Sequence, residues 1–227
     1  MATRISVVVP TLNEARGVCD TLRALAPLRQ RGHEVIVVDG GSVDGTPALA
    51  APLADRVIVS PAGRARQMNA GAAAARGDVL WFLHADTVPA ADADRTVLAA
   101  LAERGRDWGR FDVHLSGRAR LLRVVETLMN LRSRLTGIAT GDQGIFVRRA
   151  LFETVGGFPE LPLMEDIALS RRLKRHGRPA CVRPSLTASS RRWEQNGTIR
   201  TIALMWWLRL AYFSGVDPQR LAAWYRA

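Results

Sequence analysis

Short apolar runs alternate with longer segments of helical composition through the first hundred residues. The apolar runs are rich in β-branched residues and are continuous, which predicts strands buried on both faces of a parallel sheet. We expect these strands at Ile5–Val9, Val35–Asp39, Arg56–Ser60 and Val79–His84. The intervening Ala-, Leu- and Arg-rich segments predict helices at Glu14–Leu28, Thr46–Ala54 and Ala65–Ala75. The pattern therefore predicts an α/β fold with a mostly parallel sheet flanked by helices.

The second half of the chain is less regular. Alternation predicts one strand, and apolar residues at helical spacing among arginines predict a long basic helix. The expected strands are Trp108–Leu115 and Gly144–Val147, and the expected helices are Arg118–Leu135, Ile167–His176 and Thr198–Phe213. No repeat or linker is visible. We expect one domain with two halves, residues 1–116 and residues 117–227, of which the second is largely helical.

The net charge indicates the kind of partner, and the cysteine content indicates the redox compartment. The chain has 227 residues, is 48% hydrophobic and carries a net charge of +11, which favours anionic partners such as nucleotide phosphates, acidic lipids or nucleic acid. Two distant cysteines, Cys19 and Cys181, do not form a disulfide framework or a zinc motif, which favours a reducing compartment.

No segment predicts a membrane span or a secretory signal. The sequence starts directly on a predicted strand. The longest apolar stretch, Thr201–Val216, contains Arg209 and is shorter than the roughly 20 residues of a spanning helix. We therefore expect a cytoplasmic protein.

Ligands of open α/β sheets bind beyond the carboxyl ends of the strands. This rule selects four segments rich in glycine, polar or charged residues: Pro10–Glu14, Asp39–Thr46, Ser60–Asn69 and His84–Thr87. Asp39 and its glycines suit a base or ribose, or a plain strand-to-helix turn. Gly63–Gly71 places cations at a helix start, where a diphosphate would be attracted, although it also suits a solvated surface.

Two acidic segments suggest chemistry. Asp86, in His84-Ala85-Asp86, suits a divalent cation that also takes phosphate oxygens and waters as ligands, or it caps the following segment. Glu165-Asp166 suits a general base, or it adds negative charge at a helix start. The chemistry of two adjacent carboxylates leaves the identity of the base open.

Together these segments resemble glycosyltransferase family 2 with the GT-A fold. Val8–Glu14 resembles the family's opening strand and nucleotide loop, and Asp39–Thr46 its second nucleotide motif. His84-Ala85-Asp86 occupies the metal-binding D-x-D position, Glu165-Asp166 matches the E-D pair, and Arg191-Arg192-Trp193 is similar to the closing R-W element.

A narrower resemblance involves two further segments. Gly141-Asp142-Gln143-Gly144 and Leu161–Ile167 look like a subgroup associated with arsenosugar biosynthesis. Two departures from the family pattern matter. His84 replaces the first Asp of D-x-D, and Leu12 stands where many relatives carry a base-stacking aromatic residue.

The resemblance implies an inverting, metal-dependent transfer of a sugar from a nucleotide diphosphate, with uridine favoured, to the hydroxyl of a small-molecule or lipid-linked acceptor. It implies Mg²⁺ or Mn²⁺ on Asp86 and makes Asp166, paired with Glu165, the base. The loops Gly137–Gly144 and Gly156–Met164 are expected to shape the acceptor pocket. The residues expected around the nucleotide-sugar are Pro10, Leu12, Glu14, Asp39, Arg66, Asn69, His84, Ala85, Asp86, Arg192 and Trp193.

Two rival functions stay open. A nucleotidyltransferase acting on a sugar phosphate would use the same sheet, basic loop and metal carboxylate, but it has no use for Glu165-Asp166. A basic nucleic-acid-binding module is favoured by charge alone, since no recognition motif is present, and we expect no nucleic-acid partner.

The segments Arg118–Leu135 and Met205–Phe213 allow two interpretations. Basic and aromatic residues in them suit a helix lying at the inner membrane face, which would make the protein peripheral there. Segments of this kind are more often core or a homodimer interface.

Overall fold

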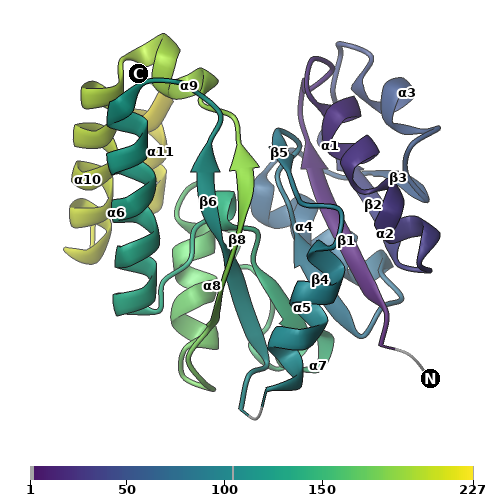
Figure 1. Ribbon diagram of the computed structural model, residues 1–227. Coiled ribbons are helices and arrows are strands. Elements are labelled where there is room, and N and C mark those ends of the chain that lie inside the picture. The colour runs from purple at the N-terminus through teal and green to yellow at the C-terminus, as the bar shows by residue number, and fades with distance from the viewer. Residues whose placement is uncertain (1–2, 104, 227) are drawn as a thin grey trace.

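The computed structural model describes residues 3–103 and 105–226, except for the side chains of residues 192, 195, 196 and 226. Within these residues the strands form one sheet in the order β3-β2-β1-β4-β7-β6-β8-β5 (Figure 1). The strands are β1 (Ile5–Thr11), β2 (Glu34–Asp39), β3 (Arg56–Val59), β4 (Val79–Phe82), β5 (Thr87–Val88), β6 (Trp108–Leu115), β7 (Phe146–Arg148) and β8 (Ala180–Ala188). Among the described residues, four of seven pairings are parallel, so the predicted mostly parallel α/β fold is confirmed.

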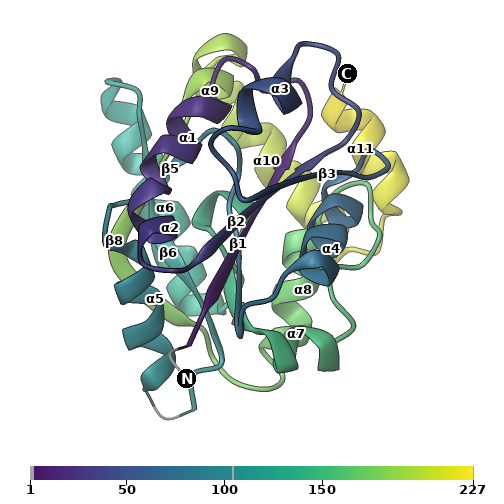
Figure 2. The same ribbon diagram turned by 90° about the vertical axis from the view of Figure 1, so that its right-hand side faces the viewer.

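Helices cover both faces of this sheet (Figure 2). The helices are α1 (Val18–Ala24), α2 (Ala26–Gln30), α3 (Thr46–Ala50), α4 (Arg64–Ala74), α5 (Ala93–Ala102), α6 (Arg120–Thr136), α7 (Arg149–Thr154), α8 (Glu165–Leu173), α9 (Arg191–Asn196), α10 (Thr198–Phe213) and α11 (Pro218–Arg226), with a 3-10 turn η1 (Gly141–Gln143). Val7 and Val9 of β1 pack with α1, α2 and α5, and Val8 packs with α4, α7 and α8. Strands that are buried on both faces explain the continuous apolar runs of the sequence.

Close contact between α4 and β1 requires a glycine. A Cβ at Gly71 of α4 would lie 2.3 Å from a methyl carbon of Val8. The helix therefore lies directly on the strand whose carboxyl end leads into Pro10–Glu14.

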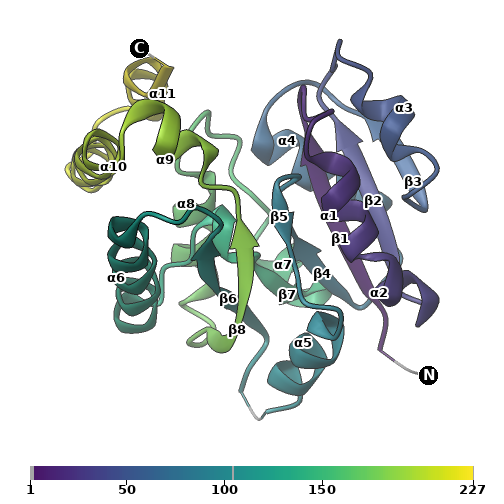
Figure 3. The same ribbon diagram turned by 45° about the horizontal axis from the view of Figure 1, so that its top comes forward.

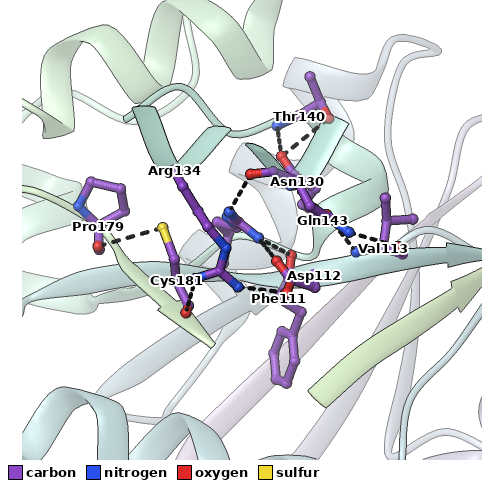
Figure 4. A network of polar contacts seen from close by, with 10 residues as sticks. Phe111, Asp112, Val113, Asn130, Arg134, Thr140, Gln143, Pro179 and Cys181 are labelled. Carbon is purple, nitrogen blue, oxygen red and sulfur yellow. Dashed lines mark hydrogen bonds and ion pairs between the residues drawn. The ribbon is translucent and has the colours of Figure 1, made fainter. Parts of the chain in front are cut away.

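A buried polar network fixes α6 against β6 (Figure 4). Asn130 of α6 accepts from Val113 N (2.9 Å) and donates to Val113 O (3.0 Å). Asp112 of β6 forms ion pairs with the fully buried Arg110 and with Arg134 of α6. Apolar packing of Leu122, Val125 and Met129 on the same strand completes the contact. Helix α6 is consequently held rigidly, and it forms one wall of the site described below.

Helices α10 and α11 pack on α8 through Leu208, Leu221 and Ile167. In Figure 3 these two helices are seen above α6. Trp207, Phe213 and Trp224 of these helices are exposed, and Trp206, which is 65% exposed, lines the cavity described below. These rings are thus not core residues, and a membrane or homodimer contact by them stays a prediction. Across the described residues, no helix is both long and apolar enough to cross a membrane.

Several predicted boundaries were wrong. The single helix expected at Glu14–Leu28 is two helices, because the chain turns at Glu14–Gly17 and again around Leu25. The helix expected at Thr46–Ala54 ends at Ala50, the strand expected at Val79–His84 ends at Phe82, and the helix expected at Ile167–His176 ends at Leu173, while its start at Glu165-Asp166 is confirmed. Elements β5, α5, α7, β8, α9 and α11 were not predicted.

Candidate active site

A cavity of about 950 Å³ opens beyond the carboxyl ends of β1 and β4 and continues between α6, α8 and α10. Its size is typical of sites for small organic ligands. The charged and polar lining residues include Glu14, Arg64, His84, Asp86, Arg132, Asp142, Glu165, Asp166, Arg191 and Arg209. Segments that are far apart in the sequence therefore meet in one space, as the strand-end rule predicts.

The loop after β1 is held in place by the loop after β2. Asn13 has a left-handed backbone conformation (φ 55°), which Asn tolerates better than most residues. Its backbone N–H donates to Ser42 Oγ at 2.8 Å. Val43 N donates to Asn13 Oδ1 at 3.0 Å, and Glu14 N donates to Thr46 Oγ1 at 2.9 Å. These contacts set Leu12, which is 45% exposed, and Glu14 in the cavity wall beside the buried Pro10.

Asp39 lies behind this wall. It is buried and accepts hydrogen bonds from Gly41 N (2.9 Å), Ser42 N (2.8 Å) and Thr11 Oγ1 (3.1 Å). Burial alone would raise the pKa of Asp39, but the hydrogen bonds from Ser42, Gly41 and Thr11 outweigh it and the pKa is lowered. Asp39 is not among the lining residues, so its observed contacts support the loops. The nucleotide contact expected for it stays a prediction.

Asp86 presents a carboxylate to the cavity. Among the described residues its side-chain oxygens have no hydrogen-bond or ion-pair partner. Burial and then the charge of Asp86 raise the pKa of Glu14, and an ion pair with Arg191 (3.5 Å) opposes this shift. The Asp86 carboxylate, which has no partner among the described residues, and the nearby Glu14 form a negative region that a divalent cation would neutralise.

The described residues contain no cluster of three potential His, Cys, Asp or Glu metal ligands. A cation at Asp86 would therefore need other ligands, and Mg²⁺ in nucleotide sites commonly takes these from phosphate oxygens and water. The donor set fits a metal that binds together with a diphosphate.

His84 forms an ion-pair contact with Asp142 of η1, with 3.2 Å between Nδ1 and Oδ1. Burial opposes ionisation of Asp142, but its hydrogen bond with His84 outweighs this and lowers its pKa. A Cβ at the adjacent Gly141 would lie 2.4 Å from His84 Nε2, so the turn approaches the ring as closely as only glycine allows. A carboxylate from a different element, that of Asp142 in η1, thus lies against the His84 ring.

Glu165 and Asp166 begin α8, after Met164 in a left-handed conformation (φ 69°). Asp166 accepts from Gly141 N (2.8 Å) and Ile167 N (2.6 Å), which fixes its carboxylate at the cavity. Glu165 is only 5% exposed, and burial followed by the charge of Asp166 raises its pKa to about 7. This arrangement combines a held carboxylate with a neighbour that carries a proton below neutral pH.

The remaining predicted residues divide between the lining and the surroundings. Ala85 and Trp193 line the cavity. Arg66 forms an ion pair with Glu160 (3.2 Å), and the Asn69 amide forms two hydrogen bonds of 2.9 Å with the backbone of Phe158. Arg66 and Asn69 are not among the residues that line the cavity. Their donor-binding role stays a prediction. The side chain of Arg192 lies outside the described residues.

Five charged lining residues were not named among the expected site residues: Arg64, Arg132, Asp142, Arg191 and Arg209. Arg64 begins α4 and lies two residues before the predicted Arg66, on a different face of the helix. Arg209 interrupts an apolar helix, and that interruption was the one sequence signal that pointed to a buried charge.

The sequence is similar to those of known glycosyltransferases. The family model described as "Glycosyl transferase family 2" matches residues 6–155. An uncharacterized glycosyltransferase of Mycobacterium tuberculosis, MT1564, is 31% identical over 167 residues, covering 69% of this chain and 63% of the relative. The probable glycosyltransferase YdaM of Bacillus subtilis is 28% identical over 194 residues, covering 75% of this chain and 46% of the relative. The chain thus spans less than two thirds of the length of these relatives.

Solved structures show the same fold. S. aureus TarS 1–349 has a TM-score of 0.67 at 22% identity, covering 82% of this chain and 60% of that one. Glucosyl-3-phosphoglycerate synthase from Mycobacterium tuberculosis, in complex with Mn²⁺, UDP and glucosyl-3-phosphoglycerate, has a TM-score of 0.63 at 23% identity, covering 82% of this chain and 72% of that one. Both neighbours are GT-A glycosyltransferases, so the predicted GT-A fold is confirmed.

Proposed function

The chain belongs to glycosyl transferase family 2, and from this premise we propose that it transfers a sugar from a nucleotide diphosphate donor to an acceptor hydroxyl. The observation that carries the proposal is the meeting of Asp86 and Glu165-Asp166 in one cavity. Uridine is the proposed base, supported by the TarS structure in complex with UDP-GlcNAc and the synthase structure in complex with UDP.

The donor lies against the loops after β1 and β4. Pro10, Leu12 and Glu14 surround the base and ribose, with Leu12 providing apolar contact in place of a stacking ring. Arg64 is exposed at the cavity and has no ion pair among the described residues, so it is available to the diphosphate. Arg191, which is paired with Glu14, is the second cation on this side.

Asp86 would hold the Mg²⁺ or Mn²⁺, and the cation would supply neutralisation of the negative charge that develops on the departing diphosphate. Its use is supported by the unpartnered carboxylate and by neighbours solved with Mn²⁺ or Mg²⁺. Asp142 and His84 add a paired acid and base at the same side of the cavity.

Asp166 is the proposed general base. It accepts the proton of the acceptor hydroxyl while the hydroxyl oxygen bonds to the anomeric carbon and the bond from that carbon to the diphosphate oxygen breaks. A single displacement of this kind inverts the anomeric configuration. The two backbone N–H groups that hold Asp166 support this role because they orient the carboxylate before substrate binds.

Two finer proposals accompany this one. Residues 1–116 bind the donor and residues 117–227 the acceptor, which is supported by the positions of the loops Thr140–Asp142 and Pro162–Met164 in the cavity wall. Membership of the arsenosugar-associated subgroup rests on the segments Gly141–Gly144 and Leu161–Ile167.

Product analysis tests the proposal against its main rival. The full chain is incubated with Mn²⁺ and either UDP-sugars or UTP plus sugar 1-phosphates, and UDP and pyrophosphate are quantified. Release of UDP from a UDP-sugar, lost in Asp86→Asn, is expected. Release of pyrophosphate from UTP would instead identify a nucleotidyltransferase.

A further inference from the structure

Two arginines on the far side of the cavity have no hydrogen-bond or ion-pair partner for their side chains among the described residues. Arg132 of α6 and Arg209 of α10 both line it. Nε and Nη2 of Arg132 and Nε of Arg209 are inaccessible to solvent and have no hydrogen-bond acceptor among the described residues. Neither guanidinium forms an ion pair with any described carboxylate. Buried donors without acceptors are destabilising, so a ligand is the natural source of the missing acceptors.

Electrostatics also make this pair unfavourable without a ligand. Burial, and then the like charge of Arg209, lower the pKa of Arg132 to about 10, while Asp166 opposes the shift. Burial likewise lowers the pKa of Arg209, against the charges of Asp166 and Asp142. The two cations therefore repel each other, and an anion between them would relieve the repulsion.

A nearby arginine of α6, Arg134, does have partners for its guanidinium. It lies two residues after Arg132, and its guanidinium donates to Asp112 and to Cys181 O (3.1 Å). The same helix thus places one arginine in a completed network (Figure 4) and the other, unpaired, at the cavity.

The pair lies nearer to Asp166 than to the residues around Glu14. Arg132 and Arg209 both feel the charge of Asp166, whereas Arg64 acts on Glu14 and Glu165, and Asp142 feels both Arg64 and Arg209. The lining around the pair is apolar and comes from the same two helices: Leu128, Leu131, Leu135, Met205 and Trp206.

We propose that Arg132 and Arg209 together bind a phosphate or carboxylate group of the acceptor whose hydroxyl Asp166 deprotonates. This inference rests on the proposed function, because it names the class of acceptor. Planar guanidinium groups suit such anions because they donate two parallel hydrogen bonds. An anion held here would fix the acceptor relative to Asp166 and would give selectivity for acidic over neutral sugars or alcohols.

The test titrates inorganic phosphate into the full chain saturated with UDP and Mg²⁺, so that the donor side is already filled. Isothermal titration compares wild type with Arg132→Gln and Arg209→Gln. Exposed arginines of the same helices, Arg120→Gln and Arg200→Gln, are the charge-matched controls. Phosphate affinity should fall by at least about tenfold in the first two variants, as expected for lost hydrogen bonds to a charged group, and change less than about twofold in the controls.

Parallel measurements keep the result interpretable. Phosphate should raise the thermal midpoint of wild type and should not raise that of Arg132→Gln. This variant should still fold, because the substitution removes a buried charge that Arg209 repels. UDP affinity should stay the same in all four variants. If UDP binds but phosphate does not, or if Arg132→Gln and Arg209→Gln keep wild-type phosphate affinity, the anion site is wrong while the donor proposal survives. Absence of UDP binding would instead overturn the proposed function.

A second arm distinguishes the sources of the anion. Methyl phosphate and hexyl phosphate carry the same charged group with different apolar lengths. If hexyl phosphate binds wild type more than about tenfold tighter, the apolar lining accommodates a lipid-linked acceptor. Equal affinity identifies a small anionic acceptor. Either result supports the site only if binding is lost in Arg209→Gln.

Discussion

Glu165→Gln should stabilise the protein at alkaline pH and leave it nearly unchanged in acid. The raised pKa means that the folded state holds the Glu165 proton more tightly than the unfolded chain does. When folding raises the pKa of an acid, the proton bound to that acid stabilises the folded state. For Glu165 this stabilisation is fully present below the unfolded pKa of 4.5 and is lost as the pH rises through the folded pKa of about 7. Glutamine resembles the neutral acid and does not undergo this loss.

The magnitude follows from the shift. At 1.36 kcal/mol per pKa unit, the wild type loses up to about 3 kcal/mol between these two pKa values. For a chain of this size, 1 kcal/mol moves the thermal midpoint by about 2–4 °C, so Glu165→Gln should melt about 6–12 °C higher than wild type at pH 8. At pH 4.5 the two midpoints should nearly coincide.

Circular dichroism melts at both pH values, with EDTA present to exclude divalent cations, provide the measurement. Glu153→Gln on α7 is the control, because Glu153 is exposed and its change should be small at both pH values. A Glu165→Gln variant that is less stable than wild type at pH 8, or equally shifted at both pH values, would refute the reasoning that burial and Asp166 hold a proton on Glu165.

Three other predictions follow from the site and its walls. Asp166→Asn should lower the rate of UDP release by about 10²–10⁴-fold, with unchanged UDP affinity in titration; an unaltered rate would remove Asp166 as the base. Gly141→Ala should displace the His84 ring, because the new Cβ would lie 2.4 Å from His84 Nε2, and the shift should appear as a changed His84 imidazole resonance in NMR. Leu208→Ala should lower the free energy of unfolding by about 2–5 kcal/mol in urea melts, whereas the exposed Leu210→Ala should change it little.

The fold was predictable where the sequence pattern is local. β1, β2 and β4 are buried on both faces, and their continuous apolar runs are a direct consequence. β8 escaped prediction because its register shifts against β6: Phe111 pairs with Val182 and Asp112 with Ser185, which leaves Arg183 and Pro184 between the paired positions. A proline and an arginine inside the run conceal the strand from a pattern search.

The site was predictable only where it follows strand ends and helix starts. Asp86 and Asp166 belong to such segments, and both reach the cavity. Arg132 and Arg209 reach it because α6 and α10 pack beside each other in the folded chain, which helical periodicity does not reveal. Arg64 and the predicted Arg66 both lie at the start of α4, and the rotation of this helix, which the sequence does not reveal, brings Arg64 to the cavity.

Metal-dependent nucleotide binding tests the central claim most directly. UDP is titrated into the full chain with and without Mn²⁺, using wild type, Asp86→Asn and the exposed control Asp92→Asn. The account predicts saturable binding that requires Mn²⁺ in wild type and Asp92→Asn and is lost in Asp86→Asn. Equal UDP binding with and without Mn²⁺, or in Asp86→Asn, would contradict a metal-bridged diphosphate at this carboxylate.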